Sequence, residues 1–227
     1  MLKKDQASRT HYFQHSLLDE KKLDRQTSDG GRVYVTEEGN AYPSVTTVLS
    51  ELNKASIIEW RNRVGEEAAN KITARAVRRG TKVHGILEDF VSNKDNYLEG
   101  HMPSNIEMFK VIEPFLTENV EEIYGIEIKL YSDTLRAAGT ADLYCKYRGL
   151  PTILDFKTSR KEKREDWILN YKLQCSTYAM MVEEIYGLIV PQYCILIGND
   201  EGTVQEFIGD TYDYRDQVIK IFEDYHT

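Results

Sequence analysis

Two aspartates and a lysine in the second half of the chain have the types and spacing needed to hold a divalent cation. Asp142 follows Gly139-Thr140-Ala141, and Asp155 and Lys157 stand two residues apart in the segment Leu154-Asp155-Phe156-Lys157. Because side chains alternate along a strand, Asp155 and Lys157 should point to the same face. Two carboxylates beside an ammonium group suit a hard cation and the water molecule that it activates.

A simpler interpretation of these residues stays open. An Asp-x-Lys pair on a strand is often a solvated surface pair whose two charges compensate each other. The apolar neighbours Ile153, Leu154 and Phe156 favour the first interpretation, because burying charged side chains that have no function costs free energy.

The composition is that of an ordinary globular protein. The chain has 227 residues, 41% hydrophobic and 29% charged, which is enough for a sizeable core. No apolar run reaches the length of a membrane span, and Met1–Gln6 lack the apolar core of a signal peptide, so a cytoplasmic location is expected. The three cysteines lie far apart, which predicts buried thiols rather than disulfides or a zinc site. The net charge of −8 argues against a general nucleic-acid coat protein but allows a local basic patch beside an acidic site.

The order of periodic segments predicts an α/β fold, with an N-terminal helical part and a mixed central sheet flanked by helices. Residues 1–30 are expected to form a loosely held arm, and Ala137–Gly139 a turn before Asp142. Ser44 is a candidate N-cap. We expect three regions: an arm with a short strand at 1–40, a helical part at 41–119, and a core at 120–227. Strands are predicted at 32–36, 120–131, 141–147, 152–157, 192–197 and 203–208, and helices at 43–52, 56–91 (broken or kinked near Gly65 and Gly80), 106–119, 165–186 and 212–226.

His84 is a candidate metal ligand in the helical part. It lies four residues before Glu88, so the two side chains share one face of a helix, as an imidazole ligand and a supporting acid would. A single histidine on a helix is also commonly a surface or core residue, and that alternative stays open.

Two clusters of polar and basic residues are candidate contacts for phosphate groups. One is a stripe on the helix that carries His84, and the other directly follows Lys157. Guanidinium groups bind phosphate oxygens in pairs, although charged runs are also common on solvated faces. The first cluster comprises Arg75, Arg78, Arg79 and Lys82, and the second Thr158, Ser159, Arg160 and Lys161.

Three further side chains are candidates for the same site. Glu127 stands between Ile126 and Ile128 on the strand before Asp142, where it could face either solvent or the cation. Gln174 and Tyr178 lie four apart on the helix that follows Lys157. A buried glutamine amide needs hydrogen-bond partners, which the site could supply, whereas the tyrosine could simply pack against the sheet.

Taken in order, these residues resemble the RecB-like branch of the PD-(D/E)xK nuclease superfamily, closest to its mitochondrial genome maintenance exonuclease and phage exonuclease groups. The resemblance covers residues 42–200. Its motifs are the entry segment 42–49, Gly80–His84 with Glu88, Glu127, Gly139–Asp142, Leu154–Ser159, and Gln174 with Tyr178.

The resemblance implies a restriction-endonuclease-like core and a cation site. Asp142 and Asp155 would bind one or two Mg²⁺ or Mn²⁺ ions, with His84 and the backbone carbonyl of Phe156 as further ligands. Lys157 would orient or deprotonate the attacking water, Glu127 would assist the metal shell, and Gln174 with Tyr178 would position DNA or the lysine. Some members hold an iron–sulfur cluster on four cysteines, which the three cysteines of this chain cannot do.

The resemblance implies that the protein is a Mg²⁺- or Mn²⁺-dependent DNA exonuclease that acts on single strands or DNA ends. It is not expected to be attached to a membrane. The helical part would arch over the site and guide the strand. A structure-specific endonuclease on the same fold and an inactive DNA-binding recombination protein are the alternatives. A monomer, and an origin in a phage or a bacterium, are compatible with the sequence.

Overall fold

The computed structural model describes residues 9–28 and 31–227. The expectation about Met1–Gln6 therefore lies outside the described residues. Within the described part, no helix combines the length and the apolar composition that a membrane span requires.

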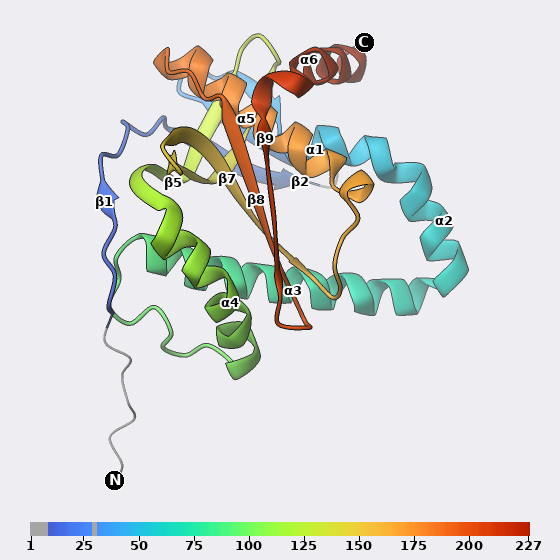
Figure 1. Cartoon of the computed structure of the whole chain (residues 1–227). Helices are drawn as coiled ribbons and strands as arrows, with labels where there is room; N and C mark the ends of the chain where they lie inside the picture. The colour runs from blue at the N-terminus through green and yellow to red at the C-terminus, as the bar shows by residue number, and fades with distance from the viewer. Residues whose placement is uncertain (1–8, 29–30) are drawn as a thin grey trace.

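A six-stranded mixed sheet forms the centre of the molecule (Figure 1). Its strand order is β1-β5-β6-β7-β8-β9, in which β1 pairs parallel to β5 and β7 parallel to β8, while the other neighbours are antiparallel. This arrangement confirms the predicted α/β class. The strands are β1 (Gln14–His15), β5 (Val120–Ser132), β6 (Ala137–Tyr147), β7 (Leu150–Ser159), β8 (Gln192–Asn199) and β9 (Val204–Asp210).

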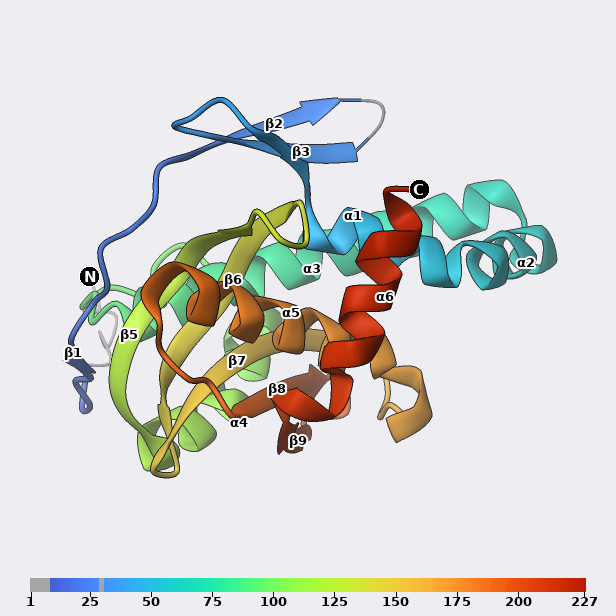
Figure 2. The ribbon, with the colours of Figure 1, turned by 90° about the horizontal axis from the view of Figure 1, so that it is seen from above.

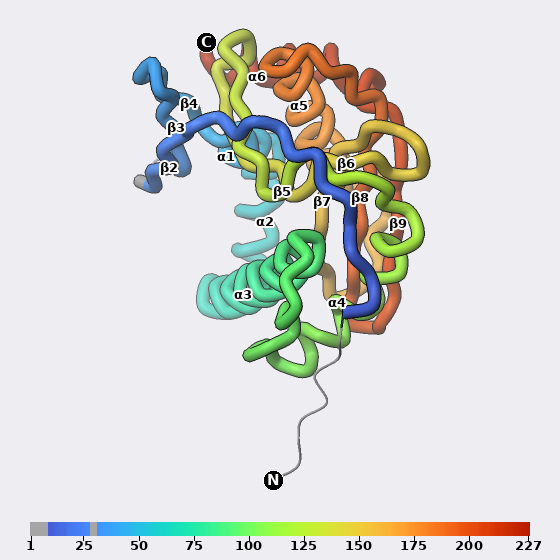
Figure 3. The backbone as a smooth tube through the Cα atoms, turned by 90° about the vertical axis from the view of Figure 1, so that its left-hand side faces the viewer, coloured from blue at the N-terminus to red at the C-terminus, as the bar shows by residue number. Residues whose placement is uncertain are grey.

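Helices cover both faces of this sheet, as the views from above and from the side show (Figures 2 and 3). On one face, side chains such as Ile153 and Ile195 pack in a core with α1 (Val45–Ser50), α5 (Leu169–Tyr186) and α6 (Arg215–Tyr225). On the other face, their strand neighbours pack with α3 (Glu66–Val91) and α4 (Pro103–Asn119). The alternation along the central strands thus builds two cores with one sheet between them.

The helical part has the expected break at Gly65 but none at Gly80. Ser44 caps α1, because its side chain accepts a hydrogen bond from the Thr47 amide. A 3₁₀ turn (Glu51–Asn53) leads into α2 (Lys54–Val64), and Gly65, at φ 85°, ends α2 as predicted. Near Gly80, the second place at which a break or kink was predicted, the helix is not broken, since α3 runs through it. This glycine lies against β7, where a Cβ atom would stand 3.7 Å from the Thr158 hydroxyl.

The N-terminal segment is held more firmly than its polar composition predicted. Phe13 is buried in the α3–α4 core, and β1 extends the sheet along the edge of β5. The partly buried Arg9 donates to the carbonyls of Asp89 and Lys94. The expectation of a loose arm is therefore wrong for the described residues from Arg9 onward, because backbone pairing and one aromatic anchor tie them down. A separate small sheet follows, made of β2 (Leu23–Ser28), β3 (Gly31–Thr36) and β4 (Ala41–Pro43).

The predicted turn before Asp142 is part of a strand. Ala137–Gly139 open β6 and pair with Leu130–Ser132 of β5. Gly139 is required here by close packing rather than by a turn, because a Cβ atom would lie 2.8 Å from the ring and hydroxyl of Tyr178 on α5. The remaining elements, including the 3₁₀ turns Glu165–Trp167 and Thr211–Tyr214, fall within a few residues of the predicted segments.

Candidate active site

The candidate site lies where two paired strands separate. The pairing of β6 with β7 ends at Leu143 and Leu154. Beyond that point β6 continues beside β5 and β7 continues beside β8. Asp142 and Asp155 are the first residues past this fork. The carboxylate of Asp142 bridges the gap, with Oδ2 accepting a hydrogen bond from the Phe156 amide at 2.8 Å.

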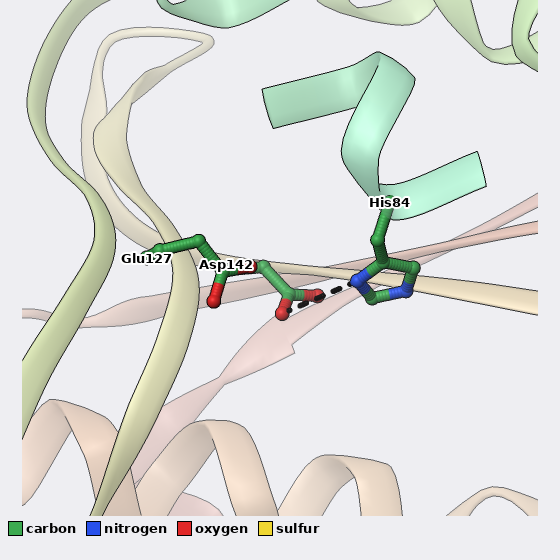
Figure 4. A group of neighbouring side chains, drawn as sticks. All are labelled: His84, Glu127 and Asp142. Carbon is green, nitrogen blue, oxygen red and sulfur yellow. Dashed lines mark ion pairs between the residues drawn. The ribbon is translucent and has the colours of Figure 1, made fainter. Parts of the chain in front are cut away.

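Three side chains from three elements converge beside the fork (Figure 4). His84 of α3, Glu127 of β5 and Asp142 of β6 each offer a ligand atom, and these atoms all lie within 4.8 Å of one another. Nδ1 of His84 is 3.6 Å from Oδ1 of Asp142. A carboxylate pair with one imidazole is a donor set that can hold a divalent cation.

An unusual backbone conformation accompanies the position of Glu127. Its φ of 46° lies in the left-handed region, which is uncommon for a residue with a side chain. Just before it, β5 shifts its register against β6 between Ile123 and Gly125, which is typical of a β-bulge. Such strain costs about 1–3 kcal/mol and concentrates at functional sites. Here it accompanies a carboxylate that faces Asp142.

The electrostatics of these three residues indicate a site that lacks positive charge. Burial raises the pKa of Glu127 to about 7, and repulsion from Asp142 adds to the shift. Burial also opposes ionisation of Asp142, but the charges of His84 and Lys157 outweigh it and lower the pKa of Asp142. Burial disfavours the charged imidazole of His84, whereas Asp142 favours it more, so the pKa of His84 is raised. Protons on Glu127 and His84 thus offset the acidic cluster.

Asp155 lies next to this group of three, and its hydrogen-bond partners come from β7 and α5. It is only 2% exposed. Its Oδ1 accepts hydrogen bonds from Nζ of Lys157 at 2.6 Å and from Nε2 of Gln174 at 3.1 Å. Its Oδ2 lies 2.5 Å from the same Nζ, so both oxygens of the buried carboxylate contact the ammonium group. Burial raises the pKa of Asp155 to about 6, against the opposing effect of Lys157.

Lys157 is held as an ammonium ion. Burial would lower its pKa, but Asp155 and then Asp142 outweigh burial, so the pKa of Lys157 is raised above its ordinary value. Its Nζ also lies 5.0 Å from the ring centroid of Tyr171, a contact that favours a cation. The alternation expected for Asp155 and Lys157 is thus seen, and the pair is buried rather than solvated.

Gln174 and Tyr178 occupy different places although they share a helix. Gln174 reaches Asp155, as described above, and a hydrogen bond to the site was the expected use of a buried amide. Tyr178 is buried beneath β6 against Gly139 and packs among the α5-side core residues. Its observed contacts support the strand that carries Asp142.

The basic residues divide into free and engaged ones. On α3, Arg75, Arg78 and Lys82 are exposed, and Lys82 lies about 200° around the helix from His84. Arg79 is engaged: it donates to the Thr158 hydroxyl and forms a 2.7 Å ion pair with Asp200. After β7, Arg160 and Lys161 are exposed, whereas the buried Ser159 hydroxyl donates to the Lys161 carbonyl.

Comparison with known proteins gives this geometry a context. No protein-family model matches the chain. Over 132 residues, 55% of the chain, it is 27% identical to mitochondrial genome maintenance exonuclease 1 of Mus musculus. Over 134 residues, it is 27% identical to the same protein of Homo sapiens. The chain is a distant homologue of this exonuclease. The resemblance noted in the sequence is confirmed at this level.

The match covers only part of each homologue. The matched segment spans 39% of the mouse exonuclease and 38% of the human one. A crystal structure of a candidate exonuclease from Eubacterium rectale superposes on 66% of this chain and 68% of its own, with a TM-score of 0.40 and 12% sequence identity. The fold class therefore rests on the sheet and helices described above.

Sequence reasoning overlooked two contacts that shape the site of this exonuclease homologue. Asp200 holds Arg79, and Tyr171 lies against Lys157. Asp200 is 121 residues from Arg79, in a turn with no motif. Tyr171 precedes Gln174 by one helical turn, a spacing that places both on one face and was a usable signal.

The residues present fit a divalent cation. His84, Glu127 and Asp142 bring their ligand atoms within 4.8 Å of one another, and Glu127 faces Asp142 at the cost of a raised pKa. A cation beside these oxygens would relieve the repulsion between the two carboxylates. The Phe156 amide points toward Asp142. Since the N–H and C=O of one strand residue point the same way, its carbonyl is directed toward the fork as well.

Metal affinity is expected to rise with pH up to about 7, because a bound cation must displace the protons held by Glu127 and His84. Between pH 6 and pH 7, loss of the competing proton of Glu127 alone should strengthen binding by about fivefold. Calorimetric titration with Mn²⁺ at both pH values, in two buffers of different ionisation enthalpy, measures the affinity and the proton release together.

The variant Glu127→Gln isolates one of the two protons. It should bind Mn²⁺ more weakly, and its pH dependence should be shallower by about one proton. Glu122→Gln, on the same strand, serves as the control, since Glu122 contacts Gln14 and Tyr124 away from the site. An equal slope in the wild type and Glu127→Gln would contradict the role of Glu127.

Proposed function

We propose that this protein is a metal-dependent nuclease that hydrolyses phosphodiester bonds in DNA, and that it acts as an exonuclease on single strands or strand ends. One observation carries the proposal: Asp142, Asp155 and Lys157 meet at the fork between β6 and β7, with His84 and Glu127 beside them. The distant homology to mitochondrial genome maintenance exonuclease 1 supports the same class of reaction.

His84, Asp142, Glu127 and Asp155 would hold the cation together with the carbonyl of Phe156. Mg²⁺ or Mn²⁺ suits this mainly oxygen donor set. When bound, such a cation polarises the phosphate and lowers the pKa of water.

Lys157 supplies positive charge of its own. The negative charge on the phosphate oxygens grows as water attacks phosphorus, and an ammonium group fixed in advance stabilises that charge. Its raised pKa favours this role, and the orientation of the water, over removal of a proton from the water. Asp155 and Gln174 keep Nζ in place through the hydrogen bonds that they share.

The decisive experiment is a cleavage assay with oligonucleotides labelled at the 5′ or the 3′ end. We expect cleavage of single-stranded DNA with Mg²⁺ or Mn²⁺, none with EDTA, and none by Asp142→Asn. An exonuclease should degrade linear strands progressively from one end and leave circular single strands intact. Cleavage of circles would instead favour the endonuclease alternative, and cation binding without cleavage would favour an inactive DNA-binding protein.

A further inference from the structure

A groove leads away from Lys157 between α3 and the segment that follows β7. Its volume is about 680 Å³. Tyr171 lines the groove and also contacts Nζ of Lys157, so one end of the groove opens at the candidate site. Trp167 of the short 3₁₀ turn also lines the groove. The other lining residues are Ile72 and Ala76 on α3, Arg79, and the stretch 158–163.

The charge of this groove is opposite to that of the whole protein. Its lining includes Arg160, Lys161 and Lys163, against a single acid, Glu162, while Arg79 is paired with Asp200. The chain as a whole carries a net charge of −8. A local basic lining on an acidic protein is the pattern expected for contact with a phosphate backbone.

The basic segment is fixed by hydrogen bonds to the body of the protein. The Ser159 hydroxyl donates to the Lys161 carbonyl at 2.6 Å. The side-chain amide of Gln205 on β9 holds Lys163 twice, accepting from its N–H at 2.6 Å and donating to its C=O at 2.9 Å. The exposed side chains of Arg160 and Lys161 thus extend from a rigid backbone, which lowers the entropic cost of binding a strand.

Trp167 presents a broad apolar surface at the edge of this groove. Its exposed fraction is 61%. The guanidinium group of Arg164 lies over its ring at 5.6 Å and is itself held by two hydrogen bonds to Asp166, both 3.0 Å. An aromatic ring that is exposed, held by its neighbours and flanked by basic side chains has the features of a stacking platform for a nucleobase.

We propose that this groove binds the single-stranded segment of DNA adjoining the scissile bond and that Trp167 stacks on one of its unpaired bases. Only an unpaired strand can offer a free base face, because in a duplex each base is covered by its neighbours. The proposal rests on the proposed nuclease function and deepens it, since it assigns the preference for single strands to one side chain.

A fluorescence titration tests the contact directly and without catalysis. The chain has two tryptophans, so Trp60→Phe leaves Trp167 as the sole indole. Titration with an oligothymidylate in EDTA should quench its fluorescence to saturation, whereas a blunt duplex of equal length should leave it unchanged. Anisotropy of a labelled strand shows independently when binding is saturated. If the Trp167 fluorescence is not quenched at those strand concentrations, the proposal is overturned.

Substitution of Trp167 measures the contribution of the stack. Trp167→Ala should weaken binding of the oligothymidylate by about 5- to 100-fold, and Trp167→Phe by less, because a phenyl ring retains part of the stack. Tyr225→Ala, an exposed aromatic on α6, should bind as the wild type does. Abasic sites placed one at a time along the strand should reveal a single position at which the missing base weakens binding to the wild type. At that position the abasic site should not weaken binding to Trp167→Ala.

The possible outcomes separate the two proposals. If the wild type cleaves DNA but Trp167→Ala binds strands as tightly as the wild type does, the groove proposal fails and the nuclease assignment stands. If the strand quenches Trp167 but the wild type never cleaves it with any divalent cation, the nuclease assignment fails. Circular dichroism of Trp167→Phe and Trp167→Ala checks that both variants are folded.

Discussion

Lys157→Ala should lower the maximal rate of DNA cleavage by about 10²- to 10⁴-fold. The substitution removes the only ammonium group that touches Asp155 among the described residues, and with it the fixed charge that would face the reacting phosphate. The loss should persist at saturating Mn²⁺, because it concerns charge stabilisation and not occupancy by the cation. Single-turnover rates on a 5′-labelled strand, measured over a range of Mn²⁺ concentrations, separate these two effects.

Two further variants bracket this result. Lys157→Arg keeps the charge but replaces a compact ammonium by a planar fork, so it should recover only part of the rate. Lys146→Ala removes a lysine from β6 that pairs with Glu121 away from the fork, and it should cleave at the wild-type rate. Full activity of Lys157→Ala would remove the basis of the mechanism.

Asp155→Asn should abolish cleavage while destabilising the fold less than Asp155→Ala does. Asparagine keeps the volume, and its oxygen can still accept from Lys157 and Gln174, which bond the carboxylate now. The lost negative charge should weaken Mn²⁺ binding by about 10- to 100-fold or more and lower the rate by about 10³-fold or more. The free energy of unfolding should fall by about 1–2 kcal/mol, because the amide keeps a hydrogen bond to Lys157 but loses the charge that pairs with it. Calorimetry, single-turnover kinetics and urea denaturation provide the three measurements.

The variant Asp155→Ala provides the comparison for stability, because it removes the hydrogen-bond acceptor as well as the charge. It leaves Lys157 without its closest carboxylate in a mostly buried position, which should lower the free energy of unfolding by roughly 3 kcal/mol. Adding Lys157→Met should restore that stability without restoring cleavage. If Asp155→Asn were as unstable as Asp155→Ala, loss of activity would reflect misfolding and would say nothing about catalysis.

The sequence predicted the parts of the site that depend on local patterns. Strand alternation placed Asp155 and Lys157 on one face, and both residues lie on β7. Periodicity predicted a helix at 165–186, and α5 spans Leu169–Tyr186. The order of elements after Asn119 could be predicted from apolar periodicity. The pattern is clear in the sequence because the central strands contribute apolar side chains to both cores.

Other features depend on contacts that no local pattern encodes. Glu127 stood with equal reason on either face, and a bulge in β5 with a left-handed residue decides the matter. The single local trace was Gly125, where a Cβ atom would lie 2.8 Å from Ile128. Arg79 was predicted to belong to a phosphate-binding stripe, but it forms an ion pair with Asp200, which is distant in the sequence. The polar composition around Phe13 did not indicate that the buried ring of this residue would anchor the N-terminal segment.

The burial of α3 is uneven along its length, and this has a consequence for how the protein accommodates a strand. From Glu66 to Arg78 its side chains are exposed except Ala69, whereas Val83, Ile86 and Leu87 are fully buried. Backbone amides in the first stretch should exchange with solvent far sooner than those beyond Val83. The buried half of the helix thus fixes the imidazole of His84, and under the proposed function the exposed half would be the part that adjusts to the bound strand.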